Sequence, residues 1–220
     1  MNDRERYIAY LEQFVTENRK KIFHDILEKR TRHFTVVLED LYQMHNVSAV
    51  IRSCDIFGLQ DVHIIQKKYD PKLSHAIAKG AEKWLDIYRH KETTQTINEL
   101  KEKGYQIVAT TPHTDDVLLS EFDVSKPSAF FFGVEKDGLS DIVLQEADVF
   151  MKIPMYGFTE SLNISVAAAL IMYETTEKLR KSDVKWKLSE DEKREIYQTW
   201  LERSIKSIDL IKKKYFEEQK

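Results

Sequence analysis

The chain has 220 residues, of which 42% are hydrophobic and 32% are charged, a balance typical of a folded globular protein rather than a disordered one. No segment stays apolar over the roughly 18–20 residues that cross a bilayer, and the amino terminus lacks the apolar stretch of a secretion signal. Cys54 is the only cysteine, which excludes a disulfide framework and a thiolate metal site. We therefore expect a soluble protein of the reducing cytoplasm.

The net charge of −3 is unevenly distributed along the chain. Residues 1–33 and 178–220 carry more Lys and Arg than Asp and Glu, whereas the segment between them is acidic. Two basic flanks are typical of a protein that binds a polyanion through one face. Charge alone favours the other interpretation, in which both flanks are amphipathic helices with solvated Lys and Glu side chains.

Apolar spacing predicts helices over the first thirty residues, where Ile8 and Leu11 and then Ile22 and Ile26 recur three or four positions apart. From Phe34 the pattern changes to short apolar runs, which indicate buried strands. The runs cover residues 34–38, 62–65, 105–109, 129–132 and 149–153, with a weaker one at 85–88. Helical segments such as 47–57 and 98–103 lie between them. Strands that alternate with helices predict an α/β domain with a mainly parallel sheet.

Helical patterns return after the last strand. Residues 161–179 are rich in Ala, Leu, Ile and Met and contain no Gly or Pro. Ser189 and Glu192 form a capping-box pattern, which predicts the start of a further helix. The apolar face of that helix continues through Ile196, Trp200, Leu201, Ile205, Ile208 and Ile211.

Common catalytic motifs are absent from the sequence. It has no G-x-x-x-x-G-K-S/T phosphate loop, no G-x-G-x-x-G turn, no H-E-x-x-H pair and no G-x-S-x-G elbow. These absences exclude most of the common α/β enzyme classes.

Two glycine loops follow neighbouring predicted strands. The first contains Gly133 and Gly138, and the second contains Gly157. A single loop of this kind makes only a turn, but two in succession favour a ligand pocket, because open α/β sheets bind ligands at the carboxyl ends of their strands. Three polar residues precede the next helix and strengthen this interpretation, namely Glu160, Ser161 and Asn163.

A third segment runs from Asn46 to Gly58, just beyond the first strand. Asn46 is a candidate helix cap. Arg52 lies near apolar residues. An arginine in such a place pairs with a carboxylate or extends its head to solvent, or else it directs its guanidinium at a phosphate or carboxylate in a pocket. Residue types alone leave both open.

Together these three segments resemble the motifs of the SpoU branch of the SPOUT RNA 2′-O-ribose methyltransferases. Motif 1 is represented by Asn46, Arg52 and Gly58. Motif 2 is represented by Gly133, Glu135, Gly138 and Ser140. Motif 3 is the stretch 153–168, which reads IPMYGFTESLNISVAA. The motifs occur in the family's order, and the resemblance covers about residues 34–180.

The resemblance implies the SPOUT α/β knot, a mainly parallel sheet whose carboxyl-terminal part is threaded as a deep trefoil. It also implies a homodimer with its site at the subunit interface. The expected domains are a helical RNA-binding extension at 1–33, a methyltransferase core at 34–180 and a helical extension at 181–220. The flanks resemble those of members that methylate guanosine 18 of tRNA. A ribosomal-RNA methyltransferase of the same fold and a non-catalytic RNA-binding protein are the alternatives.

The implied reaction transfers a methyl group from S-adenosylmethionine to a ribose 2′-hydroxyl without a metal. The catalytic or site-shaping residues implied are Arg52, Asn46, Glu135, Ser161 and Asn163. Arg52 serves as general base or, more easily for a guanidinium, as a positioning group. Backbone groups at Thr110, Gly133, Ile153 and Leu162 are expected to hold the cofactor. The expected tRNA contacts are Arg19, Lys20, Arg30, Arg32, His45, Arg180 and Lys181.

Overall fold

The fold is taken from a computed structural model that describes residues 2–41, 43–66, 80–111, 117–134 and 137–217. The chain divides into two compact units, one formed by residues 31–186 and the other by residues 1–30 together with 187–220. The two flanks, expected as separate extensions, thus belong to one unit.

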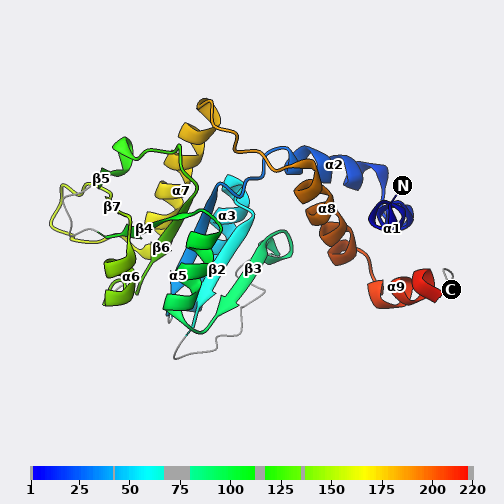
Figure 1. The fold of residues 1–220 in the computed structure, drawn as a ribbon, viewed down its shortest axis with the longest axis horizontal. Helices are drawn as coiled ribbons and strands as arrows, with labels where there is room; N and C mark the ends of the chain where they lie inside the picture. Colours follow the sequence, from blue (N-terminus) through cyan, green and yellow to red (C-terminus); the bar gives the residue numbers. More distant parts are fainter. Residues whose placement is uncertain (1, 42, 67–79, 112–116, 135–136, 218–220) are drawn as a thin grey trace. The chain divides into compact units, whose positions relative to one another are not determined.

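The larger unit is built on a seven-stranded sheet in which every recorded pairing is parallel (Figure 1). Its strands are β1 (Phe34–Glu39), β2 (Asp61–Ile65), β3 (Asp86–His90), β4 (Gln106–Thr110), β5 (Val117–Leu118), β6 (Ser128–Phe132) and β7 (Val149–Lys152). They lie in the order β3-β2-β1-β6-β4-β7-β5. The predicted α/β class with a parallel sheet is confirmed, and the trefoil threading stays a prediction.

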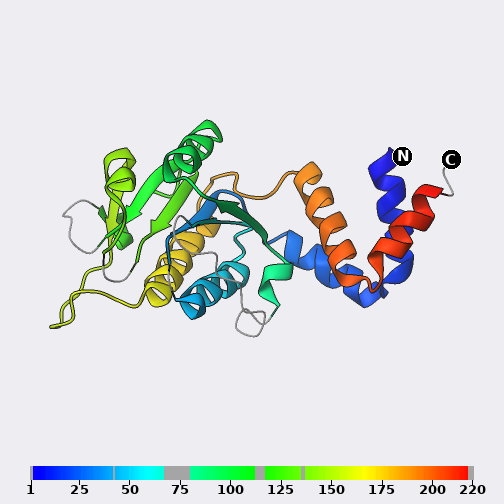
Figure 2. The same cartoon turned by 90° about the horizontal axis from the view of Figure 1, so that it is seen from below.

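Helices cover both faces of this sheet (Figure 2). On one face α3 (Met44–Phe57) packs against α7 (Ile164–Lys181), and on the other α5 (Thr93–Glu102) packs against α6 (Asp141–Glu146). Successive residues of β6 show the consequence, because Phe130 and Phe132 join the core under α3 and α7 while Phe131 joins the core under α5 and α6. Strands buried on both sides give continuous apolar runs, which is why the sequence revealed them. Short 3-10 turns lie at η2 (Ala81–Lys83) and η3 (Leu119–Glu121).

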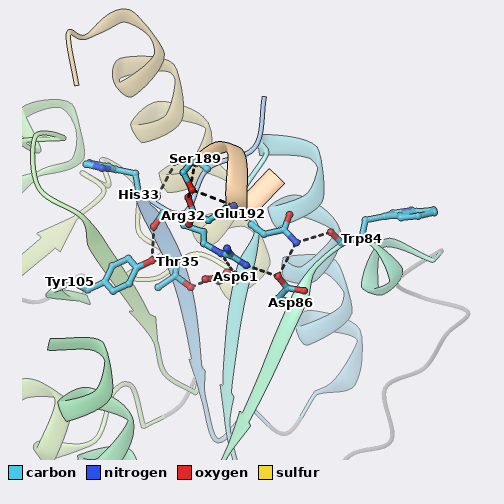
Figure 3. Close-up of polar contacts among 11 residues, drawn as sticks. Arg32, His33, Thr35, Asp61, Trp84, Asp86, Tyr105, Ser189 and Glu192 are labelled. Carbon is cyan, nitrogen blue, oxygen red and sulfur yellow. Dashed lines mark hydrogen bonds and ion pairs between the residues drawn. The ribbon is translucent and has the colours of Figure 1, made fainter. Parts of the chain in front are cut away.

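A polar network fastens the amino ends of three strands. Figure 3 shows Arg32, just before β1, with its guanidinium turned to Asp61 at the start of β2 and Asp86 at the start of β3. The nitrogen–oxygen distances are 3.1 and 2.9 Å. The Tyr105 hydroxyl donates to the Arg32 carbonyl, and the Thr35 hydroxyl donates to the Asp61 carbonyl. Burial opposes the charge on Arg32, but the two carboxylates raise its pKa above the ordinary value.

The smaller unit is helical, with α1 (Asp3–Leu11), η1 (Glu12–Phe14), α2 (Glu17–Leu27), α8 (Glu190–Ser204) and α9 (Ile208–Glu217). The capping box of Ser189 and Glu192 is confirmed. Trp200 is buried against Phe23 of α2, with ring centroids 5.5 Å apart. Among the described residues no helix has the length and hydropathy needed to cross a membrane.

Two predicted helix boundaries are wrong. The face expected to run from Ile196 to Ile211 on one helix is broken after Ser204, because Ser207 adopts a positive φ of 56° that an α-helix does not allow. The helix expected over 161–179 begins only at Ile164, since the three preceding residues belong to the loop after β7.

The buried His63 on β2 makes stability sensitive to acid. Its Nδ1 lies 2.9 Å from Nε2 of His90, and burial, reinforced by His90 and Lys103, lowers its pKa to about 3. An unfolded histidine titrates near 6.5, so the unfolded chain takes up more protons as the pH falls through the window from about 6.5 to 3. We expect His63 to cost about 2 kcal/mol of unfolding free energy between pH 7 and pH 5, measured by urea denaturation.

The variant His63→Gln serves as the comparison, because it does not titrate and should lose correspondingly less stability between the two pH values. Burial raises the pKa of Asp61 to about 6, although the positive charge of Arg32 acts to lower it. A raised carboxyl pKa favours the folded state as the pH falls, so Asp61 opposes the effect of His63 on stability. Asp61 is present in both proteins, so the difference between them isolates His63. Equal losses in both proteins would contradict the prediction.

Candidate active site

A cavity of about 600 Å³ lies at the carboxyl ends of β4, β6 and β7. Thr110 ends β4, Gly133 follows β6, Ile153 follows β7, and Leu162 precedes α7; all four line this cavity. Ser161 lines it too. The four residues expected to hold the cofactor are thus brought together from three strand ends and one helix start. The cavity volume lies within the usual range for small-molecule sites.

Gly133, one of the cavity-lining residues, lies very close to the backbone of Gly138 and Leu139. A Cβ built on this residue would lie 2.0 Å from the carbonyl oxygen of Gly138 and 2.5 Å from the nitrogen of Leu139. The close approach is held by a pair of backbone hydrogen bonds between Val134 and Gly138, with nitrogen–oxygen distances of 3.0 and 2.8 Å. Only glycine leaves room for this approach.

The electrostatics of the cavity favour a cationic ligand. Its described lining contains two acidic side chains, Asp137 and Glu160, and no Lys, Arg or His. The rest is largely apolar, with Leu139, Met155 and Ile164 among the lining residues. In the described parts of the chain, no three His, Cys, Asp or Glu side chains are grouped so as to hold a metal ion.

Two asparagines from different motifs meet beside the cavity. Asn163 caps α7 by accepting from the Ser165 amide, and its Nδ2 donates to Oδ1 of Asn46 at 3.2 Å. Asn46 is buried within the first turn of α3. It is therefore not the helix cap that we predicted, since that position is held by Gln43. The Asn46–Asn163 bond instead ties motif 1 to motif 3. Glu135 of motif 2 lies outside the described residues.

Arg52 takes a different position from the other motif residues. It lies on α3 with an exposed side chain and is not part of the cavity lining. No ion pair to Arg52 is found within the described ranges, so the alternative of a carboxylate-paired arginine receives no support there. Its guanidinium is open to a ligand or to another molecule.

The cations expected to contact tRNA differ in accessibility. Arg19 and His45 are exposed, and the Lys181 side chain is 77% exposed, with its Nζ 3.6 Å from a carboxylate oxygen of Glu177. Lys20 is paired with Glu17, and Arg180 donates to the Phe57 carbonyl.

Two of the expected cations need correction. Arg30 is only 2% exposed and lies over the Trp200 ring, and Arg32 is held by Asp61 and Asp86. Neither presents a free cation at the surface, so both leave the set of proposed tRNA contacts.

Glu39 was missed by the sequence analysis. It ends β1 and is 3% exposed, and its carboxylate accepts hydrogen bonds from Ser140 and Thr93. The sequence did contain a signal for this residue, namely one charged side chain at the carboxyl end of an apolar strand. A carboxylate that is buried there requires specific hydrogen-bond partners.

Residues 33–173 match the model of the SpoU rRNA Methylase family, which is most of the chain. The chain belongs to this family. The matched segment contains the whole seven-stranded sheet, all three motifs and every residue that lines the cavity.

Several relatives of the SpoU family align over nearly the whole chain. The tRNA (guanosine(18)-2'-O)-methyltransferase of Borreliella burgdorferi is 40% identical over 93% of this chain and 94% of its own length. The Aquifex aeolicus enzyme of the same name is 35% identical, covering 86% and 92%. The crystal structure of the A. aeolicus TrmH/SpoU tRNA modifying enzyme matches with a TM-score of 0.78 and 34% identity, covering 86% of this chain and 98% of that one.

A further similar structure is that of an AdoMet-bound rRNA methyltransferase from Sinorhizobium meliloti. It matches with a TM-score of 0.62 and 26% identity, covering 71% of this chain and 60% of that one.

Proposed function

We propose that this protein methylates the ribose 2′-oxygen of guanosine 18 in tRNA, with S-adenosylmethionine as methyl donor. The observation that carries the proposal is the cavity at the ends of β4, β6 and β7, closed by the Gly133 approach, in a chain 40% identical to an enzyme of that name. The residues fit the donor, because its sulfonium and ammonium charges match a described lining whose charged members are Asp137 and Glu160.

S-adenosylmethionine, when bound, supplies the electrophilic methyl group. A ribose hydroxyl is a weak nucleophile at neutral pH and must be oriented and helped to lose its proton. We assign the orienting role to Arg52, because a guanidinium fork holds phosphate oxygens in fixed geometry and rarely gives up its own proton. Ser161 lines the cavity, and Asn163, in the same segment, is hydrogen-bonded to Asn46.

The protein acts as a homodimer in this proposal. The α7 helix exposes Val166, Leu170 and Tyr173 to 46%, 43% and 54%, and Ile56 of α3 is 65% exposed. An apolar surface of this kind marks an interface. Arg52 lies one turn before Ile56 on α3, so it borders this surface. We propose that pairing through the surface brings Arg52 of one copy to the site of the other.

We expect Leu170→Asp to convert the dimer to a monomer and to abolish methyl transfer, because it buries a charge in the proposed interface. The matched control is Leu210→Asp, which changes a leucine that is 70% exposed on α9 and should leave the dimer intact. Sedimentation of the purified proteins measures the outcome. A wild-type chain that sediments as a monomer at micromolar concentration would contradict the proposed dimer.

The remaining accessible cations, Arg19, His45 and Lys181, are proposed to contact the tRNA backbone. Such contacts release counterions, so the affinity for tRNA should fall steeply with salt. We expect Lys181→Gln to reduce the slope of log Kd against log salt by about one. Lys101→Gln is the control, because the Lys101 side chain is only 36% exposed and is held by Glu146 at 2.7 Å, whereas Lys181 is 77% exposed and lies 3.6 Å from Glu177. A salt-independent affinity of the wild-type chain would remove the flanks from the binding surface.

The test of function is methyl transfer from labelled S-adenosylmethionine to unmodified tRNA transcript and to ribosomal RNA, with the modified nucleoside mapped. We expect label in the ribose of guanosine 18. Label only in ribosomal RNA would retain the reaction and replace the substrate, as the family's description allows. No transfer to either RNA would contradict the proposal. Such a tRNA-modifying enzyme would work in the cytoplasm.

A further inference from the structure

The carboxylate of Glu39 is an unexpected group in the centre of the larger unit. It ends β1, which lies between β2 and β6, and every residue of this strand is buried. Removing an ionised carboxylate from water is costly unless hydrogen bonds replace the lost hydration. A buried carboxyl group at this place therefore requires hydrogen-bond partners.

Among the hydrogen bonds to this carboxylate, three come from donors on Ser140 and Thr93. The Ser140 amide donates to Oε2 at 3.0 Å, and the Ser140 hydroxyl donates to Oε1 at 2.8 Å. The Thr93 hydroxyl, at the start of α5, donates to Oε1 at 2.7 Å. A carboxylate accepts at both oxygens without offering a proton, so it can hold a backbone amide and two hydroxyls together.

Ser140 is the point where the motif 2 loop enters α6. It is the amino-terminal cap of that helix and directly follows Gly138 and Leu139, both of which line the cavity. At its other end, the loop is closed by the backbone pair of Val134 and Gly138. Glu39 therefore fixes the exit of a loop whose entrance is fixed by β6.

We propose that Glu39 is a positioning residue for the cofactor. It holds Ser140, and through Ser140 it keeps Gly138 and Leu139 in the place where they form the cavity wall. This inference rests on the proposed function, since it takes S-adenosylmethionine to be the ligand of the cavity. Glu39 is not among the cavity-lining residues, so its effect on binding passes through the loop.

The test measures the Kd of S-adenosylmethionine and of S-adenosylhomocysteine by calorimetry, together with the Tm of each protein. Glutamine offers one acceptor oxygen where glutamate offers two, so Glu39→Gln should raise both Kd values about tenfold. Ser140→Ala should raise them similarly. The double variant should bind no more weakly than the weaker single variant, because both changes loosen the same Glu39–Ser140 pair.

Thr93→Val is the matched control. It removes the third hydrogen bond to Glu39 but leaves both bonds to Ser140, so it should lower the Tm while leaving the cofactor Kd within twofold of the wild type. Ser140→Thr keeps the hydroxyl and should restore most of the affinity that Ser140→Ala loses. The two variants Ser140→Ala and Ser140→Thr also provide a test if Glu39→Gln does not fold.

The outcomes separate this inference from the proposed function. A purely structural role for Glu39 predicts lower Tm values with unchanged Kd in all variants, and that result would overturn the inference. Independent, additive effects of Glu39→Gln and Ser140→Ala on Kd would overturn it too. A wild-type chain that binds neither S-adenosylmethionine nor S-adenosylhomocysteine would instead contradict the proposed function.

Discussion

Gly133→Ala is expected to weaken S-adenosylmethionine binding by about 100-fold, because the added methyl group has no space. Its carbon would lie 2.0 Å from the Gly138 oxygen and 2.2 Å from the Gly138 carbonyl carbon. Both are backbone atoms, so relief requires the loop to move away and to break the Val134–Gly138 hydrogen bonds. Overpacking of this severity costs several kcal/mol in a rigid site, which corresponds to about two powers of ten in affinity. Calorimetric titration with S-adenosylmethionine measures the effect.

Gly157→Ala is the matched control for this substitution. Gly157 lies in the neighbouring loop between β7 and α7, and a Cβ built there meets no atom within 4 Å. The same chemical change should therefore leave the affinity within about twofold of the wild type. If Gly133→Ala bound the cofactor as the wild type does, the close approach of Gly133 and Gly138 would have no part in forming the cofactor site.

Arg52→Ala is expected to reduce methyl transfer by about 10²–10³-fold while leaving the Tm and the S-adenosylmethionine affinity nearly unchanged. Loss of one charged donor at the reacting centre has an effect of this order. Folding and cofactor binding should be spared, because the side chain is exposed and lies outside the cavity lining. Arg52→Lys keeps the charge but not the fork, so it should remain strongly impaired. Single-turnover methylation of tRNA transcript measures both variants, with the exposed Arg89→Ala of β3 as control.

Subunit mixing sharpens the test of Arg52. In the proposed dimer, a copy carrying Arg52→Ala keeps an intact cavity and a copy carrying Gly133→Ala keeps an intact arginine. Mixed dimers of the two inactive variants should regain part of the wild-type activity, since one complete site can form. If the mixture is no more active than the separate variants, Arg52 and the cavity that act together belong to the same chain. Near-normal turnover by Arg52→Lys would remove the orienting role.

Local patterns predicted those features whose causes are local. The strands were readable because their side chains are buried on both faces, as Phe130 and Phe131 illustrate. The capping box of Ser189 and Glu192 uses a reciprocal contact three residues apart. The glycine loops indicated a pocket because parallel strand ends share one edge of a sheet.

The features that escaped prediction depend on partners far away in the chain. In the sequence Arg32 looks like an ordinary surface cation. Its charge is paired only in the folded chain, where Asp61 and Asp86 of two later strands lie next to it. Glu39 gains its function from Ser140, about a hundred positions onward. The break near Ser207 lies in a stretch whose apolar spacing continues undisturbed, so periodicity could not reveal it.

The joining of both flanks in one unit has a consequence for the order of events during synthesis. Residues 31–186 form a continuous stretch, so the sheet unit is complete when Trp186 leaves the ribosome. Phe23 and Leu27 of the first flank are buried in the finished protein, where Phe23 rests against Tyr197 and Trp200. Until α8 emerges, α2 has made no such contact and its apolar side remains uncovered. The first segment to be translated is thus among the last to reach its native surroundings.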